Sequence, residues 1–582
     1  MSLNVERIKT ELCVIGGGMA GINVAITAAR LGVKVVLIHE RPVFGGNASS
    51  EIRMWVCGVK DFTYRETGLS EEINLENYYY NPTKNYYLWD SILYNKVQSE
   101  KNITPLLNCT CFDAKKEGSS IKNVTAYQMT TQTMYEIEAD IFADCSGDSI
   151  LAPLSGAEYM FGREAQAEYN EPMQTHSERD EKTMGNSCLL QARKTNRKIP
   201  FRAPDWAEKV PVEKLQWVNL YDPYENFWYL ELGGNTDTIA QAETLNKRLI
   251  SLCLGVWDTI KNSGKFDADN FDLEFIGFLG AKRESRRMKG DYILTANDIM
   301  ESRVFSDTVA YGGWPLDDHN SDGFDGNEPN YTINVKKPYG IPYRCLYSSN
   351  IDNLFFAGRN ISATHMAMSS ARVMGTCSTI GQAVGTAASL CKKYHVLPRS
   401  VNKYMEELQQ TLMLNDSYLP NVKRNVASVS KIAMLSGVKD CEILRNGEDR
   451  DFLNKRNQVE FLSGESVSYR FEVPTYVKQI KIVFDSDLLR QTFDMNDCEK
   501  NHAMRANVFE DSPVMHMPKT LVKQYSLEIK YADGNKKIIE EKENRRRNIL
   551  IPVEENILET KLTIYDNWGQ HKTSGVFTFE LV

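Results

Sequence analysis

The first forty residues alternate between apolar runs and a glycine-rich break, which predicts a strand, a turn, a helix and a second strand. An apolar run at 12–15 stops at GGGMAG (residues 16–21). A helix-like segment at 22–31 follows, and a second apolar run at 35–38 leads to Glu40. Short apolar runs bounded by glycine indicate strands, and the spacing between them suits a βαβ unit.

The glycines of this turn have the spacing of a dinucleotide-binding motif. Gly16 allows the tight turn, Gly18 lets a pyrophosphate approach the backbone, and Gly21 lets helix and strand pack closely. The helix N-terminus that follows offers unpaired N–H groups to phosphate. Glu40, about twenty residues after the turn, is placed to accept hydrogen bonds from ribose hydroxyls. A purely structural glycine turn is the alternative.

Two further segments of the N-terminal part show strand patterns, at 103–112 and 139–148. The second ends in Gly147-Asp148, and such an acid binds a ribose or ribityl hydroxyl or caps the next helix. A second small-residue turn, GGNAS at 45–49, reads as a surface loop when taken alone. Its backbone and the side chains of Asn47 and Ser49 offer contacts to a cofactor.

From about residue 155 to 335 the strand–helix alternation gives way to mixed aromatic and charged segments, as in an inserted domain. The charged run at 283–287 is typical of a solvated helix face. The stretch YGGWPLDDHNSDG places Trp314, Asp317, Asp318 and His319 in a loop rich in turn residues. Such a loop suits a polar substrate, although surface loops have similar compositions.

The alternation returns at 351–390, where a strand at 354–356 precedes a glycine turn and Gly375 opens a helix. Gly381 and Gly385 lie one turn apart on that helix, a spacing that permits close packing. Beyond residue 424 the chain alternates as strands do, which predicts a β-sandwich. We therefore expect four parts: an α/β domain formed by 1–155 and 335–400, an inserted α+β cap domain at 156–334, a helical linker at 401–424 and a C-terminal β-sandwich at 425–582.

Composition narrows the function classes. The 582 residues are 42% apolar and 25% charged with a net charge of −9, which gives no electrostatic case for a nucleic-acid or membrane partner. No stretch is apolar enough to span a bilayer and the N-terminus lacks a signal-peptide pattern, so we expect a cytoplasmic protein, or a periplasmic one if a leader was removed. The twelve cysteines lack CxxC pairs, so we expect reduced thiols and no metal site.

Six stretches together resemble the FAD-dependent oxidoreductases of the glutathione-reductase-like flavoprotein class, over about residues 10–395. They are GGGMAG, GGNASSEIRMWVCG, ADCSGD, KRESRRMKGDYILTANDI, YGGWPLDDH and NLFFAGRNISATHMAMSSARVMGTCSTIGQAVGTAA. More narrowly, they are similar to a bacterial branch often found with carbohydrate-degradation genes. The C-terminal part lies outside this resemblance and is similar to galactose-binding-like domains.

The resemblance implies an FAD-binding Rossmann-like domain of the glutathione-reductase type and a set of cofactor contacts. These are Gly16, Gly18, Met19, Ala20 and Gly21 at the pyrophosphate, Glu40 and Arg41 at the adenosine ribose, Gly45, Gly46, Asn47, Ala48 and Ser49 between pyrophosphate and flavin, Cys111 at adenine, Gly147, Asp148, Gly358 and Arg359 at the ribityl chain, and Gly375 and Thr376 at the isoalloxazine. The helix opened by Gly375 would stabilise negative charge on the reduced ring.

Three absences in the sequence narrow the chemistry. No second GxGxxG follows the first, so we expect no built-in NAD(P)H domain. No CxxxxC pair follows the first βαβ unit, which argues against a redox disulfide. No histidine lies in GGNASSEIRMWVCG, where fumarate-reductase-like relatives attach the cofactor, so we expect noncovalent FAD.

The leading hypothesis is hydride transfer between a polar organic substrate and flavin N5, assisted by a protein acid or base. We expect His365 to exchange the proton, with His319 second; a structural role is the alternative for both. Arg372 and Arg283 are candidates to polarise a carbonyl or bind a carboxylate, and Arg286 and Arg287 are weaker ones because part of that run pairs with acids.

Three functions remain open at this point. The first is oxidation of a sugar or glycoside alcohol, with an unknown electron acceptor and an open oligomeric state. The second is reduction of an unsaturated carboxylate, which the arginines would also suit. The third is a carbohydrate-binding protein with structural FAD, in which Trp568 or Tyr565 stacks on a sugar.

Overall fold

The computed structural model describes residues 3–173, 176–222, 225–452, 455–493, 500, 504 and 512–582, and its contacts divide the chain into two units. The first unit comprises Met1–Lys60, Lys84–Leu408 and Asp497–Pro513. The second comprises Asp61–Thr83, Gln409–Asn496 and Val514–Val582. Each unit is described by itself below.

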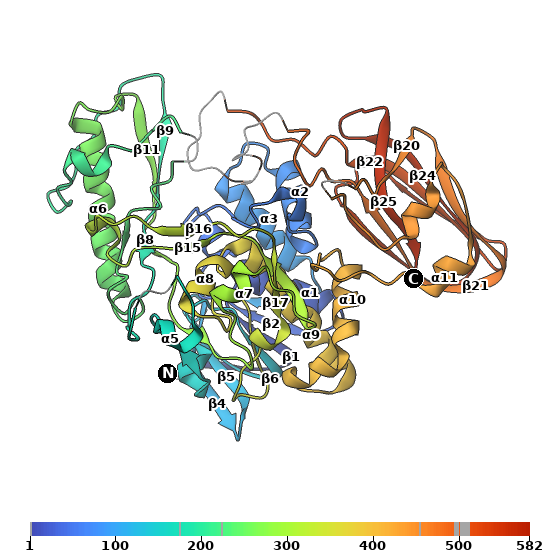
Figure 1. Cartoon of the computed structure of the whole chain (residues 1–582), viewed down its shortest axis with the longest axis horizontal. Coiled ribbons are helices and arrows are strands. Elements are labelled where there is room, and N and C mark those ends of the chain that lie inside the picture. The colour runs from blue at the N-terminus through green and yellow to red at the C-terminus, as the bar shows by residue number, and fades with distance from the viewer. Residues whose placement is uncertain are drawn as a thin grey trace. The chain divides into compact units, whose positions relative to one another are not determined.

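A mostly parallel sheet organises the first unit (Figure 1). Its order is β3-β2-β1-β6-β5-β4, and β18 lies beside the last residues of β6. The strands are β1 (Asn4–Ile15), β2 (Val35–Ile38), β3 (Ile103–Leu106), β4 (Cys109–Glu117), β5 (Ser120–Gln128), β6 (Thr133–Asp144) and β18 (Leu354–Phe356). The pairs β1–β2, β2–β3, β1–β6 and β6–β18 are parallel, whereas β4 and β5 are antiparallel. The predicted α/β core is confirmed.

The register of the sheet brings several loops of the predicted site to one edge. Ile15, the last residue of β1, pairs with Ile38 on one side and Asp144 on the other. Asp144 in turn pairs with Phe356, the last residue of β18. Because the carboxyl ends of these parallel strands coincide, the loops that follow them share an edge, which is where ligands bind in open α/β sheets.

Two helices cross closely on this sheet. Helix α1 (Met19–Arg30) packs along α9 (Met374–Tyr394). A Cβ atom on Gly381 would lie 2.3 Å from the carbonyl oxygen of Ala20, and one on Gly385 would lie 2.6 Å from that of Val24. The close packing predicted from these two glycines is confirmed.

The strand predicted at 103–112 is two strands, β3 and β4, joined by a turn. Asn108 has φ +53° at this turn, a left-handed conformation that asparagine tolerates better than most residues. The strand predicted at 139–148 belongs to β6, which starts earlier and ends at Asp144. Gly147 and Asp148 therefore lie in the turn beyond the strand.

The inserted segment of the first unit contains short strands and one long helix. Helix α6 (Ala242–Asn262) buries Leu249, Val256 and Trp257 in a hydrophobic cluster that also includes Leu190 and Phe271. Other elements of this unit are α3 (Tyr86–Gln98), α4 (Leu151–Ser155), β7 (Tyr159–Met160), α5 (Gln166–Tyr169), β8 (Asn186–Ser187), β9 (Leu190–Lys194), β10 (Glu231–Leu232), β11 (Phe271–Ile276), β12 (Ala281–Lys282), β13 (Arg287–Met288), α7 (Ala296–Met300), β14 (Thr308–Gly312), β15 (Leu316–Asp318), β16 (Tyr331–Ile333), β17 (Tyr339–Pro342) and α8 (His365–Ala371). Helix α10 (Met405–Leu414) contains the boundary between the units.

The second unit is built on antiparallel strands, ordered β20-β25-β21-β24-β22-β23 with β19 beside β21. The elements are α2 (Leu69–Tyr80), α11 (Ser428–Ile432), β19 (Met434–Gly437), β20 (Val459–Leu462), β21 (Ser466–Phe484), β22 (Val522–Tyr531), β23 (Lys536–Glu541), β24 (Asn548–Asn567) and β25 (Thr573–Leu581). The antiparallel strands predicted for 425–582 are confirmed, and their arrangement as a sandwich stays a prediction.

Residues 61–83 belong to the second unit, whereas the sequence pattern placed them in the nucleotide-binding domain. Arg490 donates to both carboxylate oxygens of Glu71 on α2, at 3.0 and 2.7 Å, and both side chains are fully buried. Removing one partner of a buried ion pair leaves an uncompensated charge, so this contact ties the segment to the strands. The two residues are far apart in sequence, and no local pattern links them.

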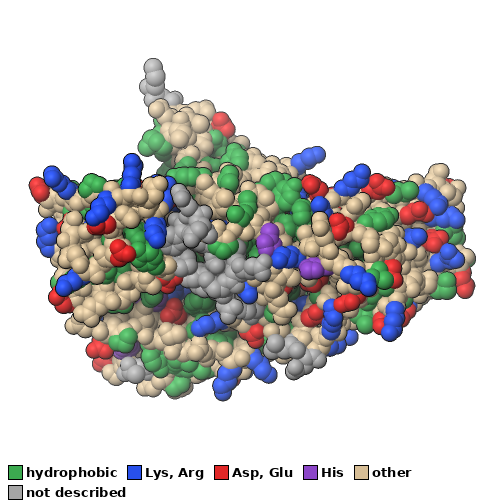
Figure 2. Space-filling model, turned by 90° about the horizontal axis from the view of Figure 1, so that it is seen from above, with side chains coloured by type: hydrophobic (Ala, Val, Ile, Leu, Met, Phe, Trp, Pro, Cys, Tyr) green, Lys and Arg blue, Asp and Glu red, His purple; other side chains and the backbone are tan. Residues whose placement is uncertain are grey.

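None of the described helices combines the length and apolar character needed to cross a lipid bilayer. On the face shown in Figure 2, acidic and basic side chains are interspersed among apolar and uncharged ones. No large patch of a single charge sign is therefore visible on this face.

Candidate functional site

A cavity of about 340 Å³ opens at the carboxyl edge of the parallel sheet in the first unit. Its lining comes from the loops that follow β1, β2, β6 and β18, from the start of α9 and from the inserted segment. Most of the predicted cofactor-binding residues line it, namely Gly16, Gly18, Met19, Ala20, Glu40, Arg41, Gly45, Gly46, Asn47, Cys111, Gly147, Asp148, Gly358 and Arg359. Gly21, Ala48, Ser49, Gly375 and Thr376 lie behind the lining.

The glycine turn after β1 forms a narrow backbone cradle. Gly16 has φ +108°, and a Cβ atom there would lie 2.3 Å from the carbonyl oxygen of Cys145, so the turn requires glycine. A Cβ on Gly21 would lie 1.8 Å from the Gly16 carbonyl oxygen, which confirms the close approach of helix and strand. At Gly18 the nearest atom, the Cα of Gly46, would be 3.9 Å away, so this position is open.

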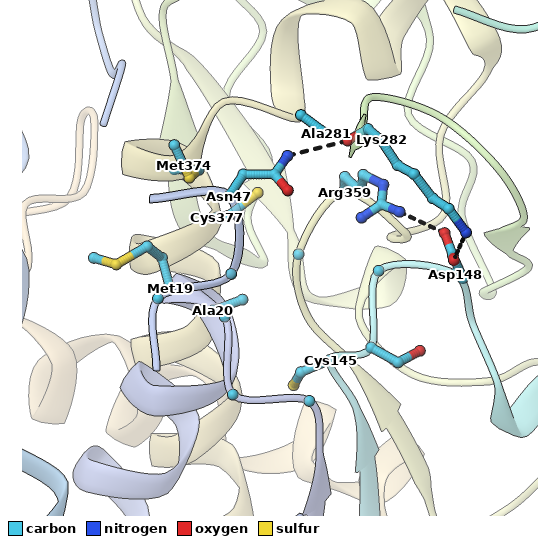
Figure 3. A pocket seen from close by; sticks show the side chains of 18 of the residues that line it. Met19, Ala20, Asn47, Cys145, Asp148, Ala281, Lys282, Arg359, Met374 and Cys377 are labelled. Atoms are coloured by element: carbon cyan, nitrogen blue, oxygen red, sulfur yellow. Dashed lines mark hydrogen bonds and ion pairs between the residues drawn. The ribbon is translucent and has the colours of Figure 1, made fainter. Parts of the chain in front are cut away.

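The start of α1 has room for an anion. Gly18 is the N-cap of α1, and no side chain caps the helix. Met19 and Ala20 begin the helix and line the cavity, as Figure 3 shows. Uncapped N–H groups and the positive end of the helix dipole stabilise a phosphate, so the residues present fit a dinucleotide.

His39, which the sequence analysis did not single out, holds the glycine turn in place. Its Nδ1 accepts a hydrogen bond from the backbone N–H of Gly17 at 3.0 Å, and its Nε2 donates to the carbonyl oxygen of Val43 at 3.0 Å. Burial, together with the nearby charge of Arg41, lowers the pKa of His39 to about 3, so the ring is neutral. A histidine directly before Glu40, the acid predicted to bind ribose, was the signal available in the sequence.

The outer end of the cavity is lined by Glu40, Arg41 and Cys111, the residues expected at the adenosine. The Glu40 carboxylate is 62% exposed and lies 4.0 Å from the Arg41 guanidinium, so it remains accessible to hydroxyl groups. The guanidinium of Arg41 lies 3.7 Å from a carboxylate oxygen of Glu51 and donates to the carbonyl oxygen of Gly46 at 3.4 Å.

Asp148 lies between two basic side chains in the middle of the cavity (Figure 3). One carboxylate oxygen is 2.5 Å from Nζ of Lys282 and the other is 2.5 Å from Nη2 of Arg359. Burial raises the pKa of Asp148, but these two cations outweigh burial and hold the pKa below its usual value. The alternative role as a helix cap is wrong, because Asp144 accepts from the N–H of Leu151 at the start of α4.

Arg359 also has an unused donor. Its Nε is buried and makes no hydrogen bond within the described part of the chain. A buried donor without an acceptor costs about 1–3 kcal/mol, so a ligand oxygen beside it would relieve that cost. This orphaned group is a second feature that fits a polyhydroxylated or phosphorylated cofactor at this point.

The inner end of the cavity is closed by the start of α9, where Val373, Met374 and Cys377 line the wall. Gly375 donates its N–H to the carbonyl oxygen of Cys57, and the buried Thr376 hydroxyl has no hydrogen-bond partner among the residues that the structure describes. Asn47 reaches across the cavity and donates to the carbonyl oxygen of Lys282 at 3.1 Å.

Two of the four catalytic candidates, Arg283 and Arg372, face the cavity at this inner end. Each has an acidic neighbour: the Arg283 guanidinium lies 3.2 Å from Glu231, and that of Arg372 lies 3.7 Å from Asp317. Nε of Arg372 is buried and unpaired within the described residues. Each of these two arginines is balanced by a carboxylate. Arg286, the weaker candidate, also lines the cavity and donates to the carbonyl oxygen of Asp148 at 3.3 Å.

His319 lies one layer behind the cavity wall, between the same two acids. Its Nδ1 is 2.6 Å from Glu231 and its Nε2 is 3.4 Å from Asp317. Its ring meets the edge of Trp228 at a centroid distance of 5.4 Å, and Trp228 lines the cavity. The pKa of Glu231 is about 2, because Arg283 and His319 outweigh the effect of burial.

His365 is fully buried and does not line the cavity. Its Nδ1 lies 2.8 Å from Glu284 and its Nε2 lies 2.9 Å from Asp318. Burial lowers the pKa of His365, but these two carboxylates outweigh burial and raise it to about 10. Both ring nitrogens of this imidazolium are engaged, so the geometry favours the structural alternative for His365.

The segment 283–287 is not a solvated helix face. Glu284 and Arg287 are 0% and 1% exposed, and they form an ion pair at 3.4 Å. Arg287 also lies 3.0 Å from Glu164, and Arg286 stacks on Tyr159. The run is buried or half-buried, and Arg283 and Arg287 pair with acids distant in sequence.

The stretch YGGWPLDDHNSDG also differs from the expected loop. Residues Thr308–Gly312 form β14, and Leu316–Asp318 form β15, which pairs with β16. The pairing of Asp317 with Thr332 and of Asp318 with Tyr331 places these acids on a short hairpin. Their positions are therefore set by backbone hydrogen bonds.

Residues 11–412 match the family model described as FAD dependent oxidoreductase. No curated protein matches the chain. Among solved structures, the chain is similar to THI4 of Thermovibrio ammonificans, at 17% identity, 27% of this chain, 66% of that chain and a TM-score of 0.21. It is also similar to FrdA of the E. coli quinol fumarate reductase, at 10% identity, 70% of this chain, 75% of that chain and a TM-score of 0.29.

The chain is also similar to CpGH89CBM32-4 of Clostridium perfringens, solved in complex with glcNAc-alpha-1,4-galactose. The identity is 10%, with 28% of this chain and 97% of that chain covered and a TM-score of 0.18. TM-scores below 0.5 support no conclusion about the activity of this chain.

Proposed function

Since the chain belongs to the family of FAD-dependent oxidoreductases, we propose that it oxidises a neutral, hydroxyl-rich substrate, a sugar or glycoside alcohol, to the corresponding ketone. FAD is the cofactor, and when bound it supplies the hydride acceptor. Gly16 to Ala20 would hold the diphosphate, Glu40 and Arg41 the adenosine end, and Asp148 with Arg359 the ribityl chain. The start of α9 would stabilise negative charge on the reduced ring.

The balance of charges at the inner end of the cavity is the observation that supports a neutral substrate. Arg283 is paired with Glu231, and Arg372 is near Asp317. The pKa values of both acids are lowered below their usual range, because the neighbouring arginines and His319 outweigh the opposing effect of burial. Both acids are therefore ionised at neutral pH, and the two arginines bring no excess positive charge to this end.

This balance distinguishes the proposal from reduction of an unsaturated carboxylate. A carboxylate substrate entering here would need an uncompensated cation, because moving a charge out of water is costly without one. A hydroxyl group needs only hydrogen-bond partners. Arg283 and Arg372, which line the cavity, supply donors for it.

Trp228 in the cavity wall, together with the aromatic rings behind it, supports a sugar as the substrate. Trp228 lines the cavity with 37% of its surface exposed. Tyr229 lies beside it, and Trp217, in contact with Tyr229, is 53% exposed. Flat apolar faces next to charged hydrogen-bonding groups match the C–H faces and hydroxyl edges of a pyranose.

We propose that the His319 imidazole accepts the proton of the reacting hydroxyl group. Nδ1 of His319 lies 2.6 Å from Glu231 and Nε2 lies 3.4 Å from Asp317, so we propose that Nε2, the less closely held nitrogen, accepts the proton. In the oxidation, the hydroxyl proton passes to Nε2 of His319. A hydride leaves the carbon that bears this hydroxyl group, and the C–O bond becomes a carbonyl. His365 fits this step less well, because both its nitrogens lie within 2.9 Å of the carboxylates of Glu284 and Asp318, whereas Nε2 of His319 is 3.4 Å from Asp317.

Anaerobic absorption spectra of the FAD-loaded protein test the proposal. Addition of a sugar or glycoside should bleach the flavin bands, and His319→Gln should slow the bleaching at least ~100-fold. His395→Asn is the matched control, because this exposed histidine at the end of α9 is remote from the cavity lining. Reoxidation of the reduced enzyme by an unsaturated carboxylate, with no bleaching by any sugar, would show the reductase and overturn the proposal.

A further inference from the structure

The second unit contains a cavity of its own, of about 410 Å³, formed between the segment after α10 and residues 447–452. Three aromatic rings line it: Tyr64, Tyr418 and Phe452. Their centroids are 5.9 to 6.3 Å apart, and each ring is tilted relative to the others. The cavity therefore has an aromatic wall.

Arg450 lies in this wall with 4% of its surface exposed. Its guanidinium donates to the carbonyl oxygens of Thr63 and Arg65 and to the hydroxyl of Thr67, and it lies 4.3 Å from the ring centroid of Tyr418. No carboxylate in the described part of the chain forms an ion pair with it. Arg450 is thus a buried cation whose partners are all neutral.

The acids around the cavity do not compensate this charge, because each already has a basic partner. Asp416 is paired with Arg547, Glu448 with Lys455, and Asp449 with Arg424 and Lys481. Arg424 has a second acid, Glu580. Lys423 lines the cavity, is exposed and forms no ion pair within the described residues. Arg450 and Lys423 therefore leave an excess of positive charge.

The remaining lining offers hydrogen bonds. The side chains of Ser417 and Asn421 line the cavity and have no hydrogen-bond partner within the described residues. A ligand that satisfies all these groups carries one negative charge, a flat face for the rings and several hydroxyl groups. Inorganic phosphate lacks the flat face, and an aromatic acid lacks the hydroxyl groups.

We propose that this cavity of the second unit binds an acidic sugar, a hexuronate. Its carboxylate is recognised by Arg450 and Lys423, its ring lies against the aromatic wall, and its hydroxyl groups meet Ser417 and Asn421. Charge-assisted hydrogen bonds to a guanidinium are about twice as strong as neutral ones, so the carboxylate supplies the discrimination against neutral sugars. This site is independent of the proposed oxidation.

Isothermal titration of the full FAD-loaded chain with glucuronate and galacturonate tests this site. At least one uronate should bind at least ~10-fold more tightly than glucose and galactose, and than phosphate and benzoate. The saturating uronate should leave the flavin spectrum unchanged, which separates this site from the oxidising one. Absence of uronate binding, or equal affinity for the neutral sugars or for benzoate, would overturn the proposal.

Variants locate the binding. Arg450→Gln should weaken uronate binding at least ~10-fold, whereas Arg456→Gln, an exposed arginine of the same unit paired with Glu460, should leave it unchanged. If Arg450→Gln lowers the melting temperature of the protein, Lys423→Gln decides, because its exposed side chain has no structural partner among the described residues. Lys423→Gln is expected to weaken uronate binding about threefold. A uronate affinity equal to that of Arg456→Gln would refute the site.

Discussion

The backbone N–H of Gly17 donates a hydrogen bond to Nδ1 of His39 across 3.0 Å, and this contact connects the two halves of the nucleotide-binding motif. Gly17 lies in the turn after β1, and His39 follows the last residue of β2. On its other side, the His39 ring is held by the carbonyl oxygen of Val43. One side chain therefore positions both the phosphate-binding turn and the loop that leads to the second glycine turn.

Replacement of His39 by leucine is expected to weaken FAD binding. The N–H of Gly17 would lose its acceptor, at a cost of about 1–3 kcal/mol, and part of that cost would appear as a looser turn around the diphosphate. We expect an increase in the dissociation constant of FAD of about 10-fold, measured by titrating the apoprotein. His395→Asn should bind FAD as the parent does, and an unchanged FAD affinity of His39→Leu would show that the contact does not shape the site.

The lowered pKa of His39 also leads us to expect that the protein loses stability in acid. The folded pKa of His39 is about 3 and the ordinary value is 6.5, so between these values the unfolded chain binds a proton that the folded chain does not. The free energy of unfolding should therefore fall as the pH is lowered from 6.5 towards 3, with a slope from this group of at most ~1.4 kcal/mol per pH unit. Denaturation curves at several pH values should show a shallower acid dependence for His39→Leu than for His395→Asn.

The raised pKa of His365 leads us to expect the opposite dependence of stability on pH. Its folded pKa is about 10, because the carboxylates of Glu284 and Asp318 outweigh burial, so the folded chain keeps a proton that the unfolded chain releases above pH 6.5. The free energy of unfolding should fall as the pH rises from 6.5 towards 10. His365→Asn, compared with His395→Asn, should be less stable at pH 7 and should lose part of this alkaline dependence. A parallel pH profile for the two variants would contradict the imidazolium assignment.

The elements that were predicted well are those whose signals are local. The strands β2 (Val35–Ile38) and β18 (Leu354–Phe356) begin and end where the apolar runs do, because a short buried strand is apolar along its whole length. Gly16 and Gly21 are required by contacts within their own turn and its neighbour. The edge of the sheet at which the cavity opens could therefore be placed from the sequence.

The substrate end could not be placed in the same way, because its contacts join distant segments. Arg283 lies against Glu231, and Asp148 is held by Lys282, which is remote in sequence. Neighbours of this kind change the role of a side chain, as His365 shows: in the sequence it is a candidate base, and in the fold it is a cation between two acids. Such roles follow from the tertiary arrangement of charges, which hydrophobic periodicity does not encode.

The crossing of α1 and α9 provides a test of how helix packing controls the cofactor site. A Cβ atom on Gly381 would lie 2.3 Å from the carbonyl oxygen of Ala20 and 2.9 Å from Cβ of Asn23, so Gly381→Ala must push α1 away from α9. Overpacking of this kind costs about 1–3 kcal/mol. Because Ala20 also lines the cavity, the displacement should weaken FAD binding as well as lower the melting temperature of the apoprotein. Gly277→Ala is the control, since a Cβ there meets nothing closer than 3.6 Å. If Gly381→Ala lowers stability and leaves FAD affinity intact, α1 can shift without disturbing the phosphate-binding turn, and the proposed coupling between the crossing and the site is wrong.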